Sequence, residues 1–92
     1  MSGLPFKEKK IGSDCWLRSF SVDEDDDEFV WHRDREDRLI KVIGGDGWMI
    51  QLDNRLPLEL SRGMEVFIKK GEWHRVLKGT SDLTLEVKKL KE

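Results

Sequence analysis

The sequence contains a single cysteine, Cys15, and it has no tyrosine and only two prolines. One cysteine cannot form an internal disulfide, so a small secreted scaffold held together by disulfides is excluded. The amino terminus lacks the apolar segment of a signal peptide, and no apolar run approaches the roughly 18 residues of a transmembrane helix. These absences predict a soluble, cytoplasmic protein that does not bind to membranes.

The charge balance argues against nucleic acid as a partner. Among 92 residues, 17 are Lys or Arg and 19 are Asp or Glu, so the formal net charge is −2. Proteins that bind nucleic acid neutralise phosphates with a basic face, and the lysine pairs of this chain are scattered along it. We therefore expect no nucleic-acid partner. A chain of this length has room for one domain, expected at 11–92, preceded by a tail or edge segment at 1–10.

Short runs of alternating apolar and polar residues recur along the chain, with turn residues between them. Because no segment has helical periodicity, this pattern predicts an all-β sandwich or barrel. The strongest local prediction is a hairpin in which the turn 44–47 joins strand 39–43 to strand 48–53. The acidic block 23–28 is predicted to be a solvated loop, since like charges resist burial. The other predicted strands cover residues 15–22, 29–32, 56–60, 65–69, 73–77 and 83–87.

The spacing of two glycines and a histidine in the second half of the chain resembles a known motif. Gly63, Gly71 and His74 match the second motif of the cupin family, G-x5-P-x-G-x2-H-x3-N. Lys69 stands at the proline position of that motif, and Lys78 stands at its asparagine position.

The first cupin motif, G-x5-H-x-H-x3-E-x6-G, aligns on His32 with more departures. Asp34 takes the place of the second histidine and Arg38 that of the glutamate. Asp26 replaces the leading glycine, and Gly45 matches the final one. The two motifs also occur in the order that the family has.

The chain thus resembles the small single-domain cupins of bacteria and their phages. The resemblance implies a double-stranded β-helix, or jelly-roll barrel, with a ligand pocket between its sheets. Cupins carry out many different reactions, so the resemblance implies neither a substrate nor a reaction, and whether the chain is an enzyme stays open.

A typical metal-binding cupin offers three histidines and a glutamate, and this chain offers His32, Asp34, Arg38 and His74. Arginine stays protonated and has no lone pair to donate, so Arg38 cannot be a ligand. Two histidines and a carboxylate remain, which is the facial-triad composition that holds ferrous iron. The resemblance therefore implies a divalent Fe, Mn, Ni or Zn ion on His32, Asp34 and His74. Arg38 would orient an anionic substrate or pair with Asp34, and Gln51 is a further candidate for substrate binding.

Two alternatives remain open. The barrel lacks a metal and binds a small anionic ligand through Arg38, or it is a non-catalytic interaction or regulatory module. Trp31 and Trp73 each precede a histidine, and strand alternation turns them to the opposite face. If the histidines face inward, the tryptophans form an apolar outer surface, and we expect a homodimer to cover it.

Overall fold

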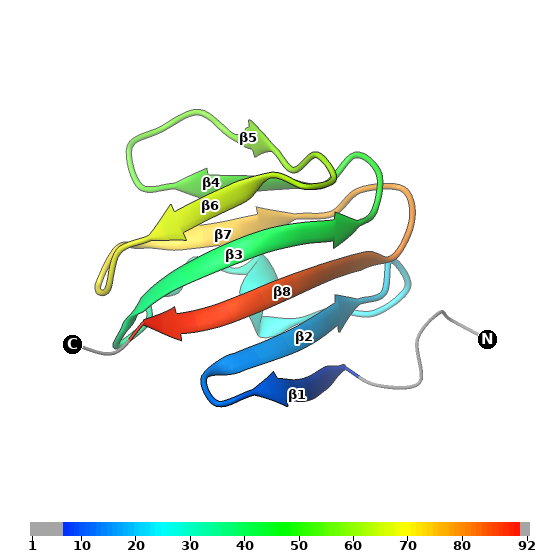
Figure 1. Cartoon of the computed structure of the whole chain (residues 1–92). Coiled ribbons are helices and arrows are strands. Elements are labelled where there is room, and N and C mark those ends of the chain that lie inside the picture. Colours follow the sequence, from blue (N-terminus) through cyan, green and yellow to red (C-terminus); the bar gives the residue numbers. More distant parts are fainter. Residues whose placement is uncertain (1–6, 91–92) are drawn as a thin grey trace.

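The computed structural model describes residues 7–90, which are mostly β-strands (Figure 1). A single turn of 3-10 helix, η1, interrupts the strands of the described chain. In chain order the elements are β1 (Glu8–Gly12), β2 (Cys15–Phe20), η1 (Asp27–Phe29), β3 (Asp37–Gly44), β4 (Met49–Leu52), β5 (Leu58–Glu59), β6 (Glu65–Ile68), β7 (His74–Leu77) and β8 (Leu83–Leu90).

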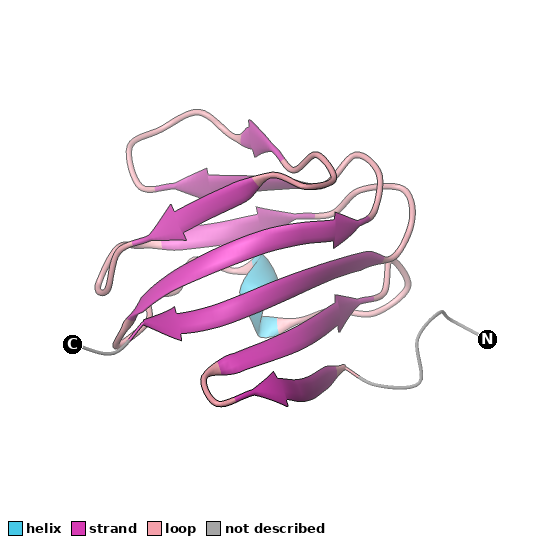
Figure 2. Ribbon diagram, in the orientation of Figure 1, coloured by secondary structure: helices cyan, strands magenta, loops and turns pink. Residues whose placement is uncertain are grey.

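The strands form two antiparallel sheets (Figure 2). The larger sheet has five strands in the order β1-β2-β8-β3-β6, and the smaller sheet has three in the order β5-β4-β7. Strands that are distant in sequence are neighbours in space, such as β2 with β8 and β3 with β8. The prediction of an all-β fold is therefore confirmed.

One apolar core lies between the two sheets. Ile40 and Val42 of β3 and Leu85 of β8 are buried on the inner face of the larger sheet. Ile50 of β4 and Val76 of β7 join the same core from the smaller sheet. Buried and less buried residues alternate along these strands, as expected for a sheet with one face on the core.

Trp48 is the largest fully buried side chain of this core. Its ring centroid lies 6.1 Å from that of Phe20 and 5.7 Å from that of Phe29. The indole N–H donates a hydrogen bond to the carbonyl oxygen of Ser81, so the one polar atom of the ring is satisfied. Through Phe29, this aromatic cluster packs η1 against the core.

The predicted hairpin is wrong. β3 pairs with β6 and β8, whereas β4 pairs with β5 and β7, so the segment 44–47 connects one sheet to the other. Gly45 has φ of 135°, a conformation that side-chain-bearing residues rarely adopt. A Cβ there would lie 2.9 Å from the Leu83 side chain. The glycines therefore serve a crossover packed against the start of β8.

The strand expected at 29–32 is also wrong. Asp27–Phe29 form η1, and an isolated bridge from His32 to His74 follows it. Asp26 caps η1, because its carboxylate accepts a hydrogen bond from the Glu28 backbone N–H at 2.9 Å. This local turn replaces the extended chain before His32.

Near both ends of the described chain, the strands extend further than the sequence predicted. Residues 8–12 form the edge strand β1, while residues 1–6 of the predicted tail or edge segment lie outside the described residues. β8 continues to Leu90, beyond the expected end at residue 87. Within the described residues, the structure has no helix of the length and apolarity that crossing a membrane requires.

Replacing Trp48 with alanine tests the role of the aromatic cluster. We expect Trp48→Ala to lower the free energy of unfolding by about 3–5 kcal/mol, because it leaves a cavity in the core. Trp73→Ala is the matched control, since Trp73 is 43% exposed, and it should cost at most about 1 kcal/mol. Urea denaturation measures both. Equal losses in the two variants would contradict this account of the core.

Candidate functional site

His32 and His74 are held against each other by the backbone. The His32 N–H donates to the His74 carbonyl at 3.0 Å, and the His74 N–H donates to the His32 carbonyl at 2.9 Å. Residues that exchange both hydrogen bonds in this way are directly opposite, and their side chains lie on the same face. The two ring centroids are 4.2 Å apart, and His74 is almost completely buried. The two histidines that the motifs singled out therefore meet in the structure.

Backbone carbonyls orient both imidazole rings. Nδ1 of His32 lies 2.7 Å from the Val30 carbonyl oxygen, and Nδ1 of His74 lies 2.8 Å from the Glu72 carbonyl oxygen. A carbonyl can only accept, so each Nδ1 must carry the proton. In each neutral ring the lone pair is then on Nε2, the atom that points away from the backbone. A hydrogen bond at one ring nitrogen that orients the other is typical of metal-binding histidines.

Glu28 completes a cluster with the two histidines. Its Oε1 lies 2.9 Å from His32 Nε2. Each of Glu28, His32 and His74 offers one ligating atom, and these atoms all lie within 4.8 Å of one another. The cluster thus contains Glu28 at the place expected for Asp34.

The sequence analysis missed Glu28 because it treated the whole acidic block as a solvated loop. Asp23, Glu24 and Asp25 are indeed exposed, but Glu28 is half-buried. A usable signal was present, since Glu28 is the last residue of the block and directly precedes the apolar Phe29. A turn that packs Phe29 against the core places its neighbour Glu28 beside His32.

Asp34 lies at the same site but has other contacts. Its side chain is 9% exposed, with Oδ1 3.4 Å from Nη1 of Arg38 and Oδ2 3.3 Å from Nε2 of His74. The approach to His74 falls short of hydrogen-bond geometry, so Oδ2 is buried without a hydrogen-bond partner among residues 7–90. Buried polar atoms normally have a hydrogen-bond partner, so among the described residues this oxygen depends on its 3.3 Å contact with His74.

Opposing influences set the pKa values of these groups. Burial alone would lower the pKa of His32, but the hydrogen bonds to Glu28 and Val30 and the nearby carboxylates raise it above its ordinary value. Burial alone would raise the pKa of Glu28, yet the hydrogen bond and charge of His32 lower it. The pKa of Asp34 is lowered despite its burial, because His74 and the Arg38 guanidinium lie beside it.

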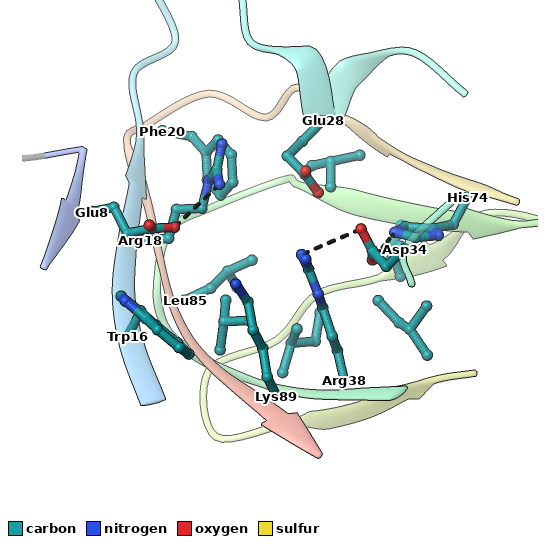
Figure 3. A pocket seen from close by; sticks show the side chains of 15 residues that line it. Glu8, Trp16, Arg18, Phe20, Glu28, Asp34, Arg38, His74, Leu85 and Lys89 are labelled. Atoms are coloured by element: carbon teal, nitrogen blue, oxygen red, sulfur yellow. Dashed lines mark hydrogen bonds and ion pairs between the residues drawn. The ribbon is translucent and has the colours of Figure 1, made fainter. Parts of the chain in front are cut away.

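The site opens into a cavity of about 200 Å³ between the sheets (Figure 3). Asp34 and His74 line one side of it, and Arg38 reaches into it from β3 with its side chain 19% exposed. The Arg38 guanidinium donates to the Glu36 carboxylate at 3.0 and 3.3 Å. Arg38 is therefore placed where the sequence analysis expected it, beside Asp34 and on the cavity.

Gln51 does not line this cavity, contrary to the expectation that it faces the pocket. In β4 its neighbour Ile50 is the inward residue, so Gln51 is on the outer face. Its amide oxygen accepts hydrogen bonds from the Arg75 guanidinium at 2.9 and 3.1 Å, and its amide nitrogen donates to the Arg55 carbonyl. Arg75 in turn lies over the ring of Trp31, at 4.9 Å from its centroid. Gln51 is thus part of the outer surface.

Comparison with known proteins identifies the fold. No protein-family model matches the sequence, and no curated protein matches it. A protein of Neisseria meningitidis has a similar structure, with a TM-score of 0.67 and 13% identity over 94% of this chain and 84% of that one. A cupin-2 domain containing protein from Shewanella frigidimarina gives a TM-score of 0.66 and 17% identity over 96% of this chain and 84% of its own.

A cupin domain from Bordetella pertussis is also similar, with a TM-score of 0.59 and 12% identity over 91% of this chain and 90% of that one. The chain is therefore a small cupin-fold domain, as its two motifs predicted. At these identities the likeness is one of fold alone. The activity of the site must be argued from its own residues.

The Glu28–His32 pair predicts a definite pH dependence in metal-free protein. A raised His32 pKa stabilises the fold fully below the ordinary histidine value of 6.5, and this contribution is lost as the pH rises through the raised pKa. A lowered Glu28 pKa stabilises the fold fully above the ordinary glutamate value of 4.5, and this contribution to stability is lost as the pH falls through the lowered pKa. The pair therefore contributes most between about pH 4.5 and 6.5.

We expect Glu28→Gln to reduce the free energy of unfolding most within that window and to lower the pKa of His32. Denaturation at several pH values and NMR titration of the imidazole protons, both with chelator present, measure the two effects. Glu24→Gln is the matched control from the exposed part of the acidic block and should change neither. A loss of stability that is constant from pH 4 to 9 would contradict the pairing.

The homodimer expected from the outer tryptophans stays a prediction. Trp31 and Trp73 are 41% and 43% exposed, and guanidinium groups of Arg75 and Arg33 lie over their rings. If a second copy covers them, wild type should sediment as a dimer and a Trp31→Gln, Trp73→Gln double variant as a monomer. Phe67→Gln removes an exposed apolar ring from the larger sheet instead and should leave the dimer intact. A wild-type monomer at every concentration tested would exclude it.

Proposed function

We propose that this cupin-fold protein binds one divalent transition-metal ion on His32, His74 and Glu28, at the side of the barrel cavity. The supporting observation is that one imidazole nitrogen from each histidine and a carboxylate oxygen converge within 4.8 Å of one another. Two imidazoles and a carboxylate suit iron, manganese, nickel or zinc, and such a set leaves coordination positions open.

The hydrogen bonds that orient the two imidazole rings require a positive charge between each ring and its neighbouring carboxylate. Each Nδ1 already donates its proton to a carbonyl, so a neutral ring has only a lone pair at Nε2. Yet Nε2 of His32 faces Glu28, and Nε2 of His74 faces Asp34. A lone pair facing a carboxylate is repelled, so each contact requires either a proton or a cation at that place. A metal ion satisfies His32, His74 and Glu28 together.

The spacing of the cluster is close to that of ligands around one ion. Metal bonds to imidazole nitrogen and carboxylate oxygen are about 2.0–2.2 Å long, so adjacent ligands of one ion are about 3.0–3.4 Å apart. The 2.9 Å contact between Glu28 and His32 already has this separation, and all three atoms lie within 4.8 Å of one another. Binding an ion would require the most widely separated atoms to move together by at most about 1–2 Å.

When bound, the ion would act as a Lewis acid at its open positions. The chain's own residues would then bind and orient what approaches it. Asp34 has a buried oxygen available to accept a proton or a hydrogen bond, and Arg38 holds Asp34 in place from the other side. This arrangement is compatible with a metal-dependent enzyme, although no single reaction follows from it.

Metal analysis of protein purified without a histidine tag tests the proposal. After reconstitution with Fe(II), Mn(II), Ni(II) or Zn(II), we expect about one equivalent of at least one of these ions and release of protons on binding, because the ligands must give theirs up. His32→Ala and His74→Ala should abolish binding, and Glu28→Gln should weaken it at least tenfold. Isothermal titration calorimetry in two buffers of different ionisation enthalpy gives both the affinity and the proton count.

Two controls identify the carboxylate. Glu24→Gln changes a residue of the same type in the exposed part of the same acidic block and should leave the affinity unchanged. If Asp34→Asn lost as much affinity as His74→Ala while Glu28→Gln lost none, the carboxylate ligand would be Asp34. Less than a tenth of an equivalent of every ion in wild type would reject the metal site and leave a metal-free barrel.

A further inference from the structure

Two cations stand directly opposite each other on the inner face of the larger sheet. Arg38 of β3 pairs with Lys89 of β8 in the antiparallel register. The neighbouring inward residues on these strands, Ile40 and Val87, are buried and apolar, and both cations line the cavity. In Figure 3 the two side chains extend side by side toward the same space. Like charges placed directly opposite are destabilising in a sheet, so this pair needs a compensating anion.

Carboxylates of the protein lie beside the pair but leave some of its hydrogen-bond donors unused. Arg38 and Lys89 share one carboxylate, Glu36, at 3.0 and 3.9 Å. The second of these distances is too long for a hydrogen bond, so the three donors of the Lys89 ammonium are not used by Glu36. Nη1 of Arg38 has a 3.4 Å ion pair with Asp34, and Asp34 is shared with His74. Both cations therefore have donors to offer to another acceptor.

The third cation of the cavity, Arg18, is in the opposite situation. Two carboxylates, Glu8 at 3.3 Å and Asp26 at 3.2 Å, surround its single guanidinium. An incoming anion would be repelled there. The attraction for an anion is thus confined to the Arg38–Lys89 side, which is also the side that carries Asp34 and His74 (Figure 3).

The rest of the cavity is apolar and small. Its floor consists of aliphatic side chains from both sheets, and Trp16 forms a wall with the Lys89 ammonium 4.5 Å from its ring centroid. Pockets for drug-sized ligands measure about 300–1,000 Å³, and this one is about 200 Å³. A ligand that fits has a short apolar body. The aliphatic floor residues are Ile40, Ile50, Ile68, Val76, Leu85 and Val87.

The proposed metal ion, on which this inference rests, determines the sign of the charge. On this side of the cavity, Arg38 and Lys89 pair with the carboxylates of Asp34 and Glu36, and the carboxylate of Glu28 also lines the cavity beside His32. A divalent ion adds two positive charges and leaves one of them uncompensated. We propose that the cavity binds a small monocarboxylate, with its carboxylate between Arg38 and Lys89 and its apolar body on the aliphatic floor.

Calorimetric titration of the metal-loaded protein tests this inference with matched pairs of probes. Butanoate and benzoate are compared with butanamide and benzamide, which have nearly the same shape but no charge. We expect each carboxylate to bind at least tenfold more tightly than its amide, since charge-assisted hydrogen bonds are the stronger ones. Equal affinities for acid and amide would overturn the inference.

Lys89→Met and Arg38→Met identify the residues. Each should weaken carboxylate binding about tenfold and leave the weak amide binding unchanged, and Lys89→Met, which contacts none of the proposed ligands, should also leave the metal affinity unchanged. Lys88→Met is the matched control, because Lys88 adjoins Lys89 on β8 but is exposed on the outer face. Arg38→Met removes a partner of the buried Asp34 and can unfold the protein. If that variant does not fold, Lys89→Met alone tests whether the two cations bind the carboxylate. Carboxylate binding that survives Lys89→Met at wild-type strength would overturn the inference.

The two proposals fail in different ways. Metal affinity is measured on the same samples before any carboxylate is added, so loss of the metal site is seen in that first titration. If the wild type binds metal but shows no preference for carboxylates, the proposed ligand class is wrong and the proposed metal site is still supported.

Discussion

The antiparallel bridge between His32 and His74 is the constraint on which the site depends. Two residues that exchange both backbone hydrogen bonds must project their side chains from the same face of the sheet. His74 begins β7 and His32 follows η1, so the bridge joins the loop to the smaller sheet at one point. The carbonyls of Val30 and Glu72 then fix both rings through Nδ1. The backbone alone thus holds the two imidazole rings close together, with each Nδ1 bonded to a carbonyl and each Nε2 free to face the carboxylates.

Carboxylates and cations alternate around that place. Glu28 meets His32, Asp34 stands between His74 and Arg38, and Glu36 stands between Arg38 and Lys89. Charges as little exposed as these are stable only when each has a partner, so the arrangement behaves as one network. At the position where the cupin motif has a glutamate, this chain has Arg38, which cannot donate a lone pair and instead pairs with Asp34 and lines the cavity. The same residue therefore enters both proposals, as a group that cannot be a metal ligand and as a cation on the cavity wall.

Strand alternation determined most of the local structure, and it failed where alternation carries no information. At 73–77 it predicted that Trp73 and His74 face opposite sides, and His74 is buried whereas Trp73 is 43% exposed. At 29–32 no strand forms, so the bridge to His74 sets the direction of His32 instead. Alternation could not decide the direction of Gln51, because the preceding run Trp48–Ile50 is apolar on both faces. The hairpin failed for a related reason. A period of two shows which residues share a face, but it does not show which strand lies alongside.

The sequence by itself determined the all-β class, and it contains the cupin-like order of glycines and histidines that singled out His32 and His74. The all-β class follows from local rules of alternation and turn chemistry, whereas the histidine pair is what the resemblance to the cupin motifs implied. Only the tertiary structure decided that the clustered carboxylate is Glu28 and that Lys89 stands beside Arg38. The first depends on a turn whose Phe29 packs against Phe20 and Trp48, and the second on pairing between strands far apart in sequence. Such contacts arise from packing the whole chain around one core, so a local pattern can mark Glu28 as a candidate but cannot show what it contacts.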